Sequence, residues 1–582
     1  MRGLVGAPPL ALCLLLLLTA PASAGGGGPA ADVDASRLPQ PKLIDHGYGP
    51  GVEPTRWRKM SRLALNLAGI VPELPVDPVA ATQGIFGQPL SWPIVPIHMS
   101  LLPDGRVLTY GTTPAGKASG SLVYVLFDPD KGTGPEALSV MPNTTTTDIF
   151  CSAQSIMAQT GETLITGGAR KVNYSINSTT IFDSSSNAIR AAQPMSYARW
   201  YPTLVALPNG DMLTVGGRQD IGVPTTMPEI FSATAGWRTL PLADSIAAFG
   251  LAKGNWWYPQ AYLTPTGDVF ILGHDGAMFR LDPTNSGAIT KLAKKVTVAH
   301  QSLATVMFQP GRLLSIRNKL EADVIDINGS EPTVRKTSPI DQLRYYGSLT
   351  VMADGKVLYN GGSIVINKLG GVAYLGIIWD PATEQWTTTA AAAKPRLYHS
   401  SSLLLPDATV LTGGGGPPGP VLNMNAEIYY PPYLFDSSGQ LAPRPEIVDS
   451  PSSLPAGGSF AVQVGEGTTV SRVTLVRGGS ATHNFNPDQR FFALPFTQDG
   501  TTLTVDAPAD RRVAPPGAYM LFAFDAAGVP SHARMMMAAV EPPPTDPPPD
   551  PPTDPTDQPP DDTNNPPADQ PTVTPSALRK GR

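Results

Sequence analysis

The sequence predicts an all-β protein that consists of a seven-bladed β-propeller followed by a β-sandwich. One observation is a unit of tight turn, apolar strand and glycine that recurs seven times along the chain. A second is the change of pattern after residue 440, where short alternating runs replace this unit. A third is the near absence of helical periodicity, apart from a candidate helix over residues 55–67.

Seven copies of the repeat unit define the propeller. They lie at residues 102–111, 159–168, 207–217, 264–273, 309–316, 352–362 and 405–414, and the fifth copy is the weakest. Asp-Gly or Asn-Gly at the turn supplies the positive φ of a tight hairpin, and the closing glycines let the chain bend where blades converge. The spacing of about 43 to 57 residues between the ends of successive copies is typical of four-stranded, kelch-type blades over residues 85–440. A β-sandwich with chance glycine pairs is the alternative for this region.

Residues 441–540 predict an immunoglobulin-like domain. Runs such as 459–464 and 472–476 alternate apolar and polar side chains and lie between Gly, Pro and Asp turns. About 100 residues of this pattern suit a sandwich of two antiparallel sheets.

The first 24 residues predict an export signal peptide. Arg2 provides a positive start, residues 10–18 form an apolar run, and residues 22–24 are small enough for cleavage. The run is shorter than the roughly 20 residues that span a bilayer, and no other stretch is long enough. We therefore expect a secreted protein without a transmembrane segment.

Composition characterises the two chain ends and limits the classes of binding partner. Residues 25–84 lead into the propeller, and the Pro/Asp-rich residues 541–582 predict a disordered tail. The net charge is −6 with no basic run, which makes nucleic acid and anionic membranes poor candidate partners. No feature indicates an oligomeric state, and a monomer is consistent with the sequence.

The cysteine count is unusual for an exported protein. The chain has two cysteines, Cys13 and Cys151, and Cys13 would leave with the signal peptide. The single remaining thiol stays free, pairs between chains or serves another purpose.

Aromatic clusters precede several repeat copies at a matching place. They are Arg-Trp-Tyr-Pro at 199–202, Trp-Trp-Tyr-Pro at 256–259, Arg-Tyr-Tyr-Gly at 344–347 and Arg-Leu-Tyr-His-Ser at 396–400. In a propeller, this is where the chain enters an inner strand, so the side chains would converge at one mouth of the central channel. Packing between blades is an equally good interpretation for any single aromatic residue.

Two histidines are candidates for a metal site. His399 follows Tyr398 at the predicted mouth, and both side chains could reach one metal only where the backbone is irregular, because neighbours in a regular strand point to opposite faces. His483 lies in the polar segment 480–490 of the last domain, which could also reach the mouth. Motifs of zinc peptidases, serine hydrolases and nucleotide triphosphatases are absent from the sequence.

These residues resemble the galactose oxidase and glyoxal oxidase family of copper-radical oxidases. The resemblance covers residues 74–540. Its marks, in the family's order, are Phe-Cys at 150–151, Ala-Arg-Trp-Tyr at 198–201, the segment 396–406, and Thr-His at 482–483 with Asp-Gln-Arg at 488–490. The resemblance implies an oxidase that converts small alcohols or aldehydes with O2 and releases hydrogen peroxide.

The resemblance also implies the role of each site residue. Cys151 and Tyr201 would form a thioether that carries the radical. Tyr201, His399 and His483 would bind one copper ion in the plane, with Tyr398 as axial ligand and general base. Two imidazoles, phenolate oxygens and an open position suit Cu(II).

Two departures from galactose oxidase affect the expected substrate. Residues 218–220 read Arg-Gln-Asp where the family's stacking tryptophan is expected, which leaves Trp200, Trp256 and Trp257 as candidates. The arginine that holds the sugar is not found either. The sequence therefore favours the glyoxal oxidase branch, with a small aldehyde or alcohol and O2 as partners.

Two other classes of function compete with the oxidase. One is a non-catalytic kelch propeller that binds glycan or protein at the cell surface. The other is a propeller hydrolase or lyase, which is the weaker alternative because the predicted mouth lacks a convincing carboxylate pair. Tight copper binding that depends on the two histidines would favour the oxidase.

Overall fold

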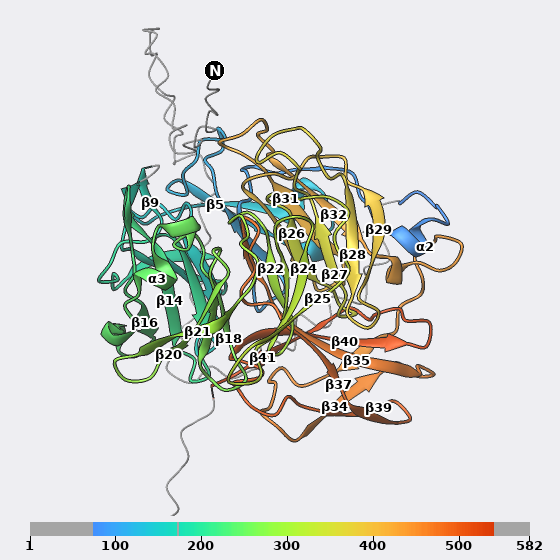
Figure 1. Cartoon of the computed structure of the whole chain (residues 1–582). Helices are drawn as coiled ribbons and strands as arrows, with labels where there is room; N and C mark the ends of the chain where they lie inside the picture. Colours follow the sequence, from blue (N-terminus) through green and yellow to red (C-terminus); the bar gives the residue numbers. More distant parts are fainter. Residues whose placement is uncertain (1–73, 172–173, 541–582) are drawn as a thin grey trace, which may run out of the picture. The chain divides into compact units, whose positions relative to one another are not determined.

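The computed structural model describes residues 74–171 and 174–540 of the chain (Figure 1). The predicted signal peptide, the candidate helix over 55–67 and the Pro/Asp-rich tail lie outside these residues. Two short α-helices occur within them, α2 (Ala80–Gln83) and α3 (Ile246–Phe249). Neither has the length or the apolar character to cross a membrane.

Each of the seven repeat copies forms an antiparallel hairpin between two fully or almost fully buried strands. The hairpins are β3 (His98–Leu101) with β4 (Val107–Tyr110), β7 (Ala153–Ile156) with β8 (Thr163–Thr166), β13 (Trp200–Ala206) with β14 (Met212–Asp220), β18 (Gln260–Leu263) with β19 (Val269–Leu272), β22 (Thr305–Gln309) with β23 (Arg312–Ile316), β26 (Ser348–Val351) with β27 (Val357–Asn360), and β30 (Ser400–Leu404) with β31 (Val410–Gly414). The weak fifth copy thus forms the same hairpin as the others. Burial on both faces explains why these strands are apolar throughout.

Further antiparallel strands extend each hairpin into a sheet of four or five strands. They are β5 (Val123–Phe127), β6 (Leu138–Pro142), β11 (Thr179–Asp183), β12 (Ala188–Ala192), β16 (Glu229–Ser232), β17 (Gly236–Thr239), β20 (Ala277–Asp282), β21 (Ala288–Lys295), β24 (Ala322–Asp326), β25 (Thr333–Lys336), β28 (Leu375–Asp380), β29 (Gln385–Ala391) and β32 (Asn425–Tyr430). The last strand of a sheet is the most exposed, as in β21 and β25.

The first strands of the described region complete the sheet of the last repeat. β1 (Ile85–Phe86) and β2 (Leu90–Ser91) both pair with β32, so the beginning and the end of the repeat region share one sheet. Such pairing protects an edge that would otherwise be open. The arrangement agrees with a β-propeller, and the count of seven blades stays a prediction.

Residues after 440 form two four-stranded antiparallel sheets. One contains β33 (Ile447–Asp449), β34 (Ser459–Val464), β39 (Thr502–Asp506) and β38 (Phe496–Asp499), and the other contains β37 (Phe491–Leu494), β35 (Val470–Arg477), β40 (Gly517–Asp525) and β41 (Arg534–Ala538). Buried side chains from both sheets, such as Val462, Leu475, Leu503 and Leu521, form one apolar cluster. This agrees with the predicted β-sandwich, and its immunoglobulin-like detail stays a prediction.

A short strand of the sandwich region joins a propeller sheet. β36 (Ser480–Thr482) pairs with β3 in antiparallel register, with Thr482 opposite His98. The Gln154 side chain donates a hydrogen bond of 3.0 Å to the Ala481 carbonyl and anchors the strand from a second sheet. This non-local pairing fixes the place of His483, the next residue.

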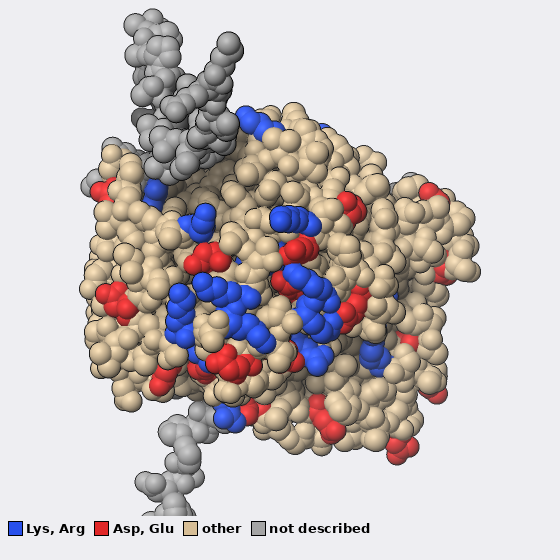
Figure 2. Space-filling model, in the orientation of Figure 1, with Lys and Arg blue, Asp and Glu red and all other residues tan. Residues whose placement is uncertain are grey.

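Charged side chains lie mainly on the outer strands. Figure 2 shows Lys and Arg side chains over β21 and β25, with Asp and Glu side chains between them. Several of these charges are paired, for example Lys336 with Glu321 at 2.8 Å and Arg335 with Glu384. Exposed pairs of this kind contribute little stability.

Candidate metal centre

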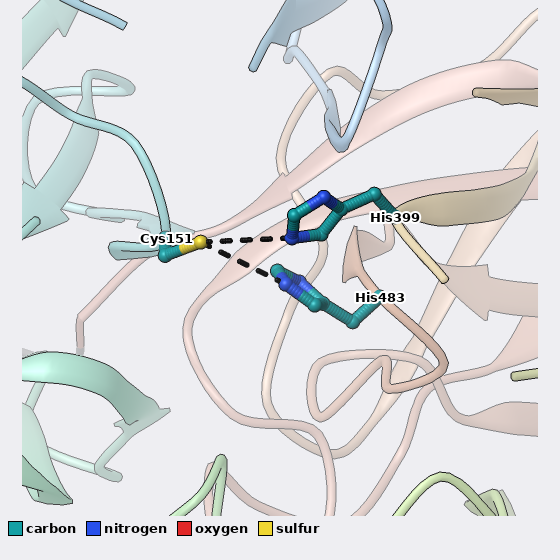
Figure 3. A group of neighbouring side chains, drawn as sticks. All are labelled: Cys151, His399 and His483. Carbon is teal, nitrogen blue, oxygen red and sulfur yellow. Dashed lines mark hydrogen bonds between the residues drawn. The ribbon is translucent and has the colours of Figure 1, made fainter. Parts of the chain in front are cut away.

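A cysteine and two histidines from distant parts of the chain converge in the buried interior. The Cys151 sulfur lies 3.9 Å from His399 Nε2 and 3.8 Å from His483 Nε2. Figure 3 shows the two imidazoles side by side, each with a ring nitrogen facing the sulfur. The three potential ligand atoms lie within 4.8 Å of one another, and all three residues are buried.

Unusual backbone conformations direct these side chains into the cluster. Cys151, Tyr201, His399 and His483 have φ values of 58°, 66°, 68° and 60°. Positive φ is uncommon for residues other than glycine, costs about 1–3 kcal/mol each and concentrates at functional sites. The irregularity at His399 also explains how both it and Tyr398 reach the site, with their rings stacked at 3.8 Å.

Cys151 and Tyr201 come from consecutive sheets and touch. The Tyr201 amide donates a hydrogen bond of 3.0 Å to the Cys151 carbonyl. Burial raises the pKa of the Cys151 thiol well above its usual value, and hydrogen bonding with the Tyr201 side chain opposes that rise. The predicted thioether partners are therefore joined by a backbone hydrogen bond within the same buried cluster.

Tyr201 and Tyr398 form a hydrogen-bonded pair of phenols. Their hydroxyl oxygens are 2.5 Å apart, and the two side chains are 2% and 8% exposed. Burial raises the pKa of both hydroxyl groups well above the usual value. Each phenol can therefore donate a proton to, or accept one from, the other.

The structure selects one of the three candidate tryptophans as the cover of Tyr201. The Trp257 ring stacks on the Tyr201 ring at a centroid distance of 4.3 Å and an interplanar angle of 9°. Trp256 meets the same ring at 64° and 5.8 Å, and Trp200 is tilted by 40° at 4.5 Å. Trp257 comes from the chain that leads into β18 of the following sheet, next to Tyr258, whose amide bonds to the Tyr201 carbonyl at 2.9 Å.

The imidazoles are prepared to act as neutral ligands. His399 Nδ1 lies 2.7 Å from the Pro417 carbonyl, which can only accept, so Nδ1 carries the proton and Nε2 keeps its lone pair. His483 Nδ1 bonds to Thr482 Oγ1 at 2.7 Å, so its Nε2 also faces the cluster. Burial lowers the pKa of His399 to about 3 and that of His483 well below its usual value. Two imidazoles with two phenols fit Cu(II) better than calcium or magnesium, which prefer carboxylates.

Sequence reasoning missed two buried ion pairs that hold the site-bearing loops. Arg199, two residues before Tyr201, pairs with Glu229 at 2.9 Å, and both side chains are fully buried. Arg396, shortly before His399, pairs in the same way with Glu427 at 2.7 Å. The arginines are visible in the sequence motifs, but their partners depend on strand register.

Each pair ties its loop to two strands of the same sheet. Arg199 also donates to the Gly216 carbonyl at 2.8 Å, and Arg396 donates to the Gly414 carbonyl at 3.0 Å. Glu229 in turn accepts a hydrogen bond of 2.7 Å from the Ser196 amide. Removing one partner of a buried pair leaves an uncompensated charge, so these contacts impose a single loop geometry.

His98 is a third histidine beside the cluster, and the sequence offered no signal for it. Its fully buried ring stacks on Tyr110 at 4.3 Å and meets the His483 ring edge-on at 5.8 Å. His98 Nδ1 bonds to Gln154 Oε1 at 3.1 Å. The ring therefore packs against the candidate ligand His483.

Two family models and a solved structure are similar to this chain. Residues 133–307 match the family model described as glyoxal oxidase N-terminus, and residues 444–538 match the galactose oxidase-like, early set domain. A fungal alcohol oxidase solved in complex with copper has the same fold, with a TM-score of 0.69 and 25% sequence identity. The superposition covers 78% of this chain and 99% of the alcohol oxidase.

Curated relatives agree with this class. Galactose oxidase of Gibberella zeae is 28% identical over 77% of this chain and 70% of its own length. Aldehyde oxidase GLOX1 of Arabidopsis thaliana is 24% identical over 66% of this chain and 70% of its own length. The predicted resemblance to the galactose oxidase and glyoxal oxidase family is confirmed.

Proposed function

We propose that this chain is an exported copper-radical oxidase that oxidises small aldehydes, as their hydrates, or primary alcohols and reduces O2 to hydrogen peroxide. One observation carries the proposal: the Cys151 sulfur, two imidazole Nε2 atoms and the Tyr201–Tyr398 pair form a single buried cluster. The similarity to galactose oxidase, aldehyde oxidase and a copper-bound alcohol oxidase supports it.

The residues of the cluster would hold one copper ion. His399, His483, Tyr201 and Tyr398 would be its ligands. When bound, copper supplies one of the two oxidising equivalents and polarises the substrate oxygen. The hydrogen bond that His399 Nδ1 donates to the Pro417 carbonyl and the bond between His483 Nδ1 and Thr482 Oγ1 orient the two imidazoles for this role.

Cys151 and Tyr201 would provide the second oxidising equivalent. A bond forms between Cys151 Sγ and a ring carbon of Tyr201, and the thiol and ring hydrogens leave with two electrons to O2 as hydrogen peroxide. Sulfur substitution delocalises the unpaired electron of the tyrosyl radical. The stacked Trp257 ring covers the radical and excludes water from one of its faces.

The reaction divides proton and hydrogen transfer between the two tyrosines. Tyr398 accepts the hydroxyl proton of the substrate as general base. The Tyr201 oxygen, as the site of the radical, would take a hydrogen atom from the adjacent carbon. An aldehyde hydrate and O2 give a carboxylic acid and hydrogen peroxide, whereas a primary alcohol and O2 give an aldehyde and hydrogen peroxide.

A peroxide assay on the copper-loaded full chain tests the proposal. The panel contains glyoxal, methylglyoxal, glycolaldehyde, galactose and simple primary alcohols. We expect peroxide from the small aldehydes and none from the Cys151→Ser variant. Wild-type protein that binds copper but yields no peroxide across the panel would instead indicate a non-catalytic binding propeller.

A further inference from the structure

Two consecutive side chains of β7 hold the segment 481–488, which contains His483. Gln154 donates a hydrogen bond of 3.0 Å to the backbone carbonyl of the first residue of this segment. Ser155 donates a hydrogen bond of 2.7 Å to Asp488 Oδ2 at the other end. Both side chains are buried. β7 therefore contacts the segment on both sides of the imidazole.

The same strand lies next to the thiol. β7 begins two residues after Cys151, whose sulfur is 3.8 Å from His483 Nε2. The sulfur depends on this strand through the chain, and the imidazole depends on it through Gln154 and Ser155. One strand thus determines the positions of two groups that lie 332 residues apart in the sequence.

The partners of the Gln154 carboxamide fix its orientation. The Ala481 carbonyl can only accept, so the amide nitrogen faces it and Oε1 faces the opposite partners. The Tyr110 hydroxyl therefore donates to Oε1 at 3.0 Å, and His98 Nδ1 donates to it at 3.1 Å. Both donors are fully buried and lie on β4 and β3. Rotation of the carboxamide would leave buried donors unpaired, which holds it in one position.

We propose that Gln154 and Ser155 are positioning residues for copper binding: they hold the His483 imidazole in the cluster through the segment that carries it. The inference rests on the proposed oxidase function and adds two residues to the machinery that assembles its metal site. Removing a group that orients a metal ligand from outside the ligand set lowers metal affinity by about 10- to 100-fold. Thioether formation should slow as well, because it requires the loaded site.

Copper affinity, measured on the full chain by competition with a chelator, tests this role. Gln154→Met keeps the length of the side chain but lacks its hydrogen bonds, and we expect copper affinity to fall by roughly tenfold or more. Ser155→Ala removes one hydroxyl group and leaves Asp488 paired with Arg477, so the variant should fold normally. We expect Ser155→Ala to lower copper affinity by roughly threefold or more, as for the loss of one hydrogen bond.

Gln260→Met is the matched control for Gln154→Met. Both glutamines are 3% exposed, and Gln260 joins β18 to the next sheet through the Leu303 carbonyl at 3.3 Å and the Thr305 hydroxyl at 2.8 Å. Its loss should lower the free energy of unfolding in urea as Gln154→Met does, but leave copper affinity at the wild-type value. The electron paramagnetic resonance spectrum of bound Cu(II) separates ligand geometry from stability. We expect this spectrum to change in Gln154→Met and to stay the same in Gln260→Met.

Hydrogen exchange before copper loading tests the positioning without the metal. The Thr482 amide donates a hydrogen bond of 2.9 Å to the Phe485 carbonyl and so reports on the turn that carries His483. We expect this amide to exchange faster in Gln154→Met than in wild type and Gln260→Met.

The outcomes distinguish this inference from the proposed function. A variant with wild-type copper affinity and a wild-type spectrum would overturn the positioning role of the residue that it replaces and leave the oxidase intact. If Gln154→Met does not fold, Ser155→Ala alone decides by the same criteria. Wild-type protein that binds copper but makes no peroxide would overturn the oxidase and leave the positioning role, because copper affinity measures that role directly.

Discussion

The phenolic oxygens of Tyr201 and Tyr398 lie 2.5 Å apart in the buried interior, although 197 residues separate them in the chain. Each tyrosine precedes or begins the inner strand of a different sheet, β30 for Tyr398 and β13 for Tyr201. The pair also contacts a stacked indole, Trp257, and the imidazoles of His399 and His483. The pair therefore connects the candidate metal ligands to the ring that would carry the radical.

Copper binding should depend on the two imidazoles. Replacing either His399 or His483 by alanine removes a ligand, and we expect copper affinity to fall by at least about 100-fold. Thr482→Val keeps the imidazole but removes the partner of His483 Nδ1, and it should cost roughly 10- to 100-fold in copper affinity. Competition with a chelator measures the affinity, and His300→Ala, at a half-buried histidine that hydrogen-bonds to Ser302, is the control. Equal affinity in wild type and His483→Ala would exclude this ligand set.

The stacked indole should prolong the life of the radical. Trp257→Ala uncovers one face of the Tyr201 ring, so we expect the optical band of the oxidised protein to decay several times faster, with copper content unchanged. Trp386→Phe is a control, because that indole lies on the outer strand β29, is half-buried and donates to the Ser338 carbonyl. If the Trp257→Ala variant decays at the wild-type rate, Trp257 does not protect the Tyr201 radical.

Removing one partner of the buried ion pair near His399 should destabilise the protein strongly. Arg396→Met leaves Glu427 charged and unpaired, and we expect the free energy of unfolding to fall by about 3–5 kcal/mol. The double variant Arg396→Met with Glu427→Gln should recover much of that loss. Arg335→Met breaks an exposed pair with Glu384 and should cost at most about 1 kcal/mol. Urea unfolding measures the stability of all three variants. Equal losses for Arg396→Met and Arg335→Met would show that burial of the pair does not determine the loss.

Acid should destabilise the protein through its buried neutral histidines. Burial lowers the pKa of His274 from 6.5 to about 4. Between these values the unfolded chain binds a proton that the folded chain does not, so this histidine stabilises the fold above pH 6.5 and loses that contribution as the pH falls toward 4. The loss is at most about 1.4 kcal/mol per pH unit. Relative to wild type, the unfolding free energy of His274→Gln should decline less steeply with falling pH over this range. An unchanged dependence of the unfolding free energy on pH would show that His274 does not cause the loss.

The hairpins were predictable because their determinants are local. A turn pair such as Asp104-Gly105, followed by an apolar strand, specifies the geometry of β3 and β4 without reference to the rest of the chain. The cluster of Cys151, Tyr201, Tyr398, His399 and His483 followed from the family resemblance, and the structure brings these five residues together.

Other features depend on contacts that no local pattern encodes. β36 joins β3 through a pairing that spans more than 300 residues. The sequence could therefore predict that His483 reaches the cluster, but not that this strand pairing brings it there. The choice of Trp257 over Trp256 depends on the backbone of the next sheet, where Tyr258 has a φ of 34°. The partners of Arg199 and Arg396 require the register of the third strand in each sheet.

The covalent bond between Cys151 and Tyr201 is the most direct test of the whole account. The full chain is loaded with copper in air, digested and examined by mass spectrometry. We predict one cross-linked species that contains residues 151 and 201, lighter by two hydrogens than the sum of its two peptides and absent in Cys151→Ser. A Cys151 thiol that remains fully available to an alkylating agent in the unfolded, copper-treated protein would contradict the radical oxidase.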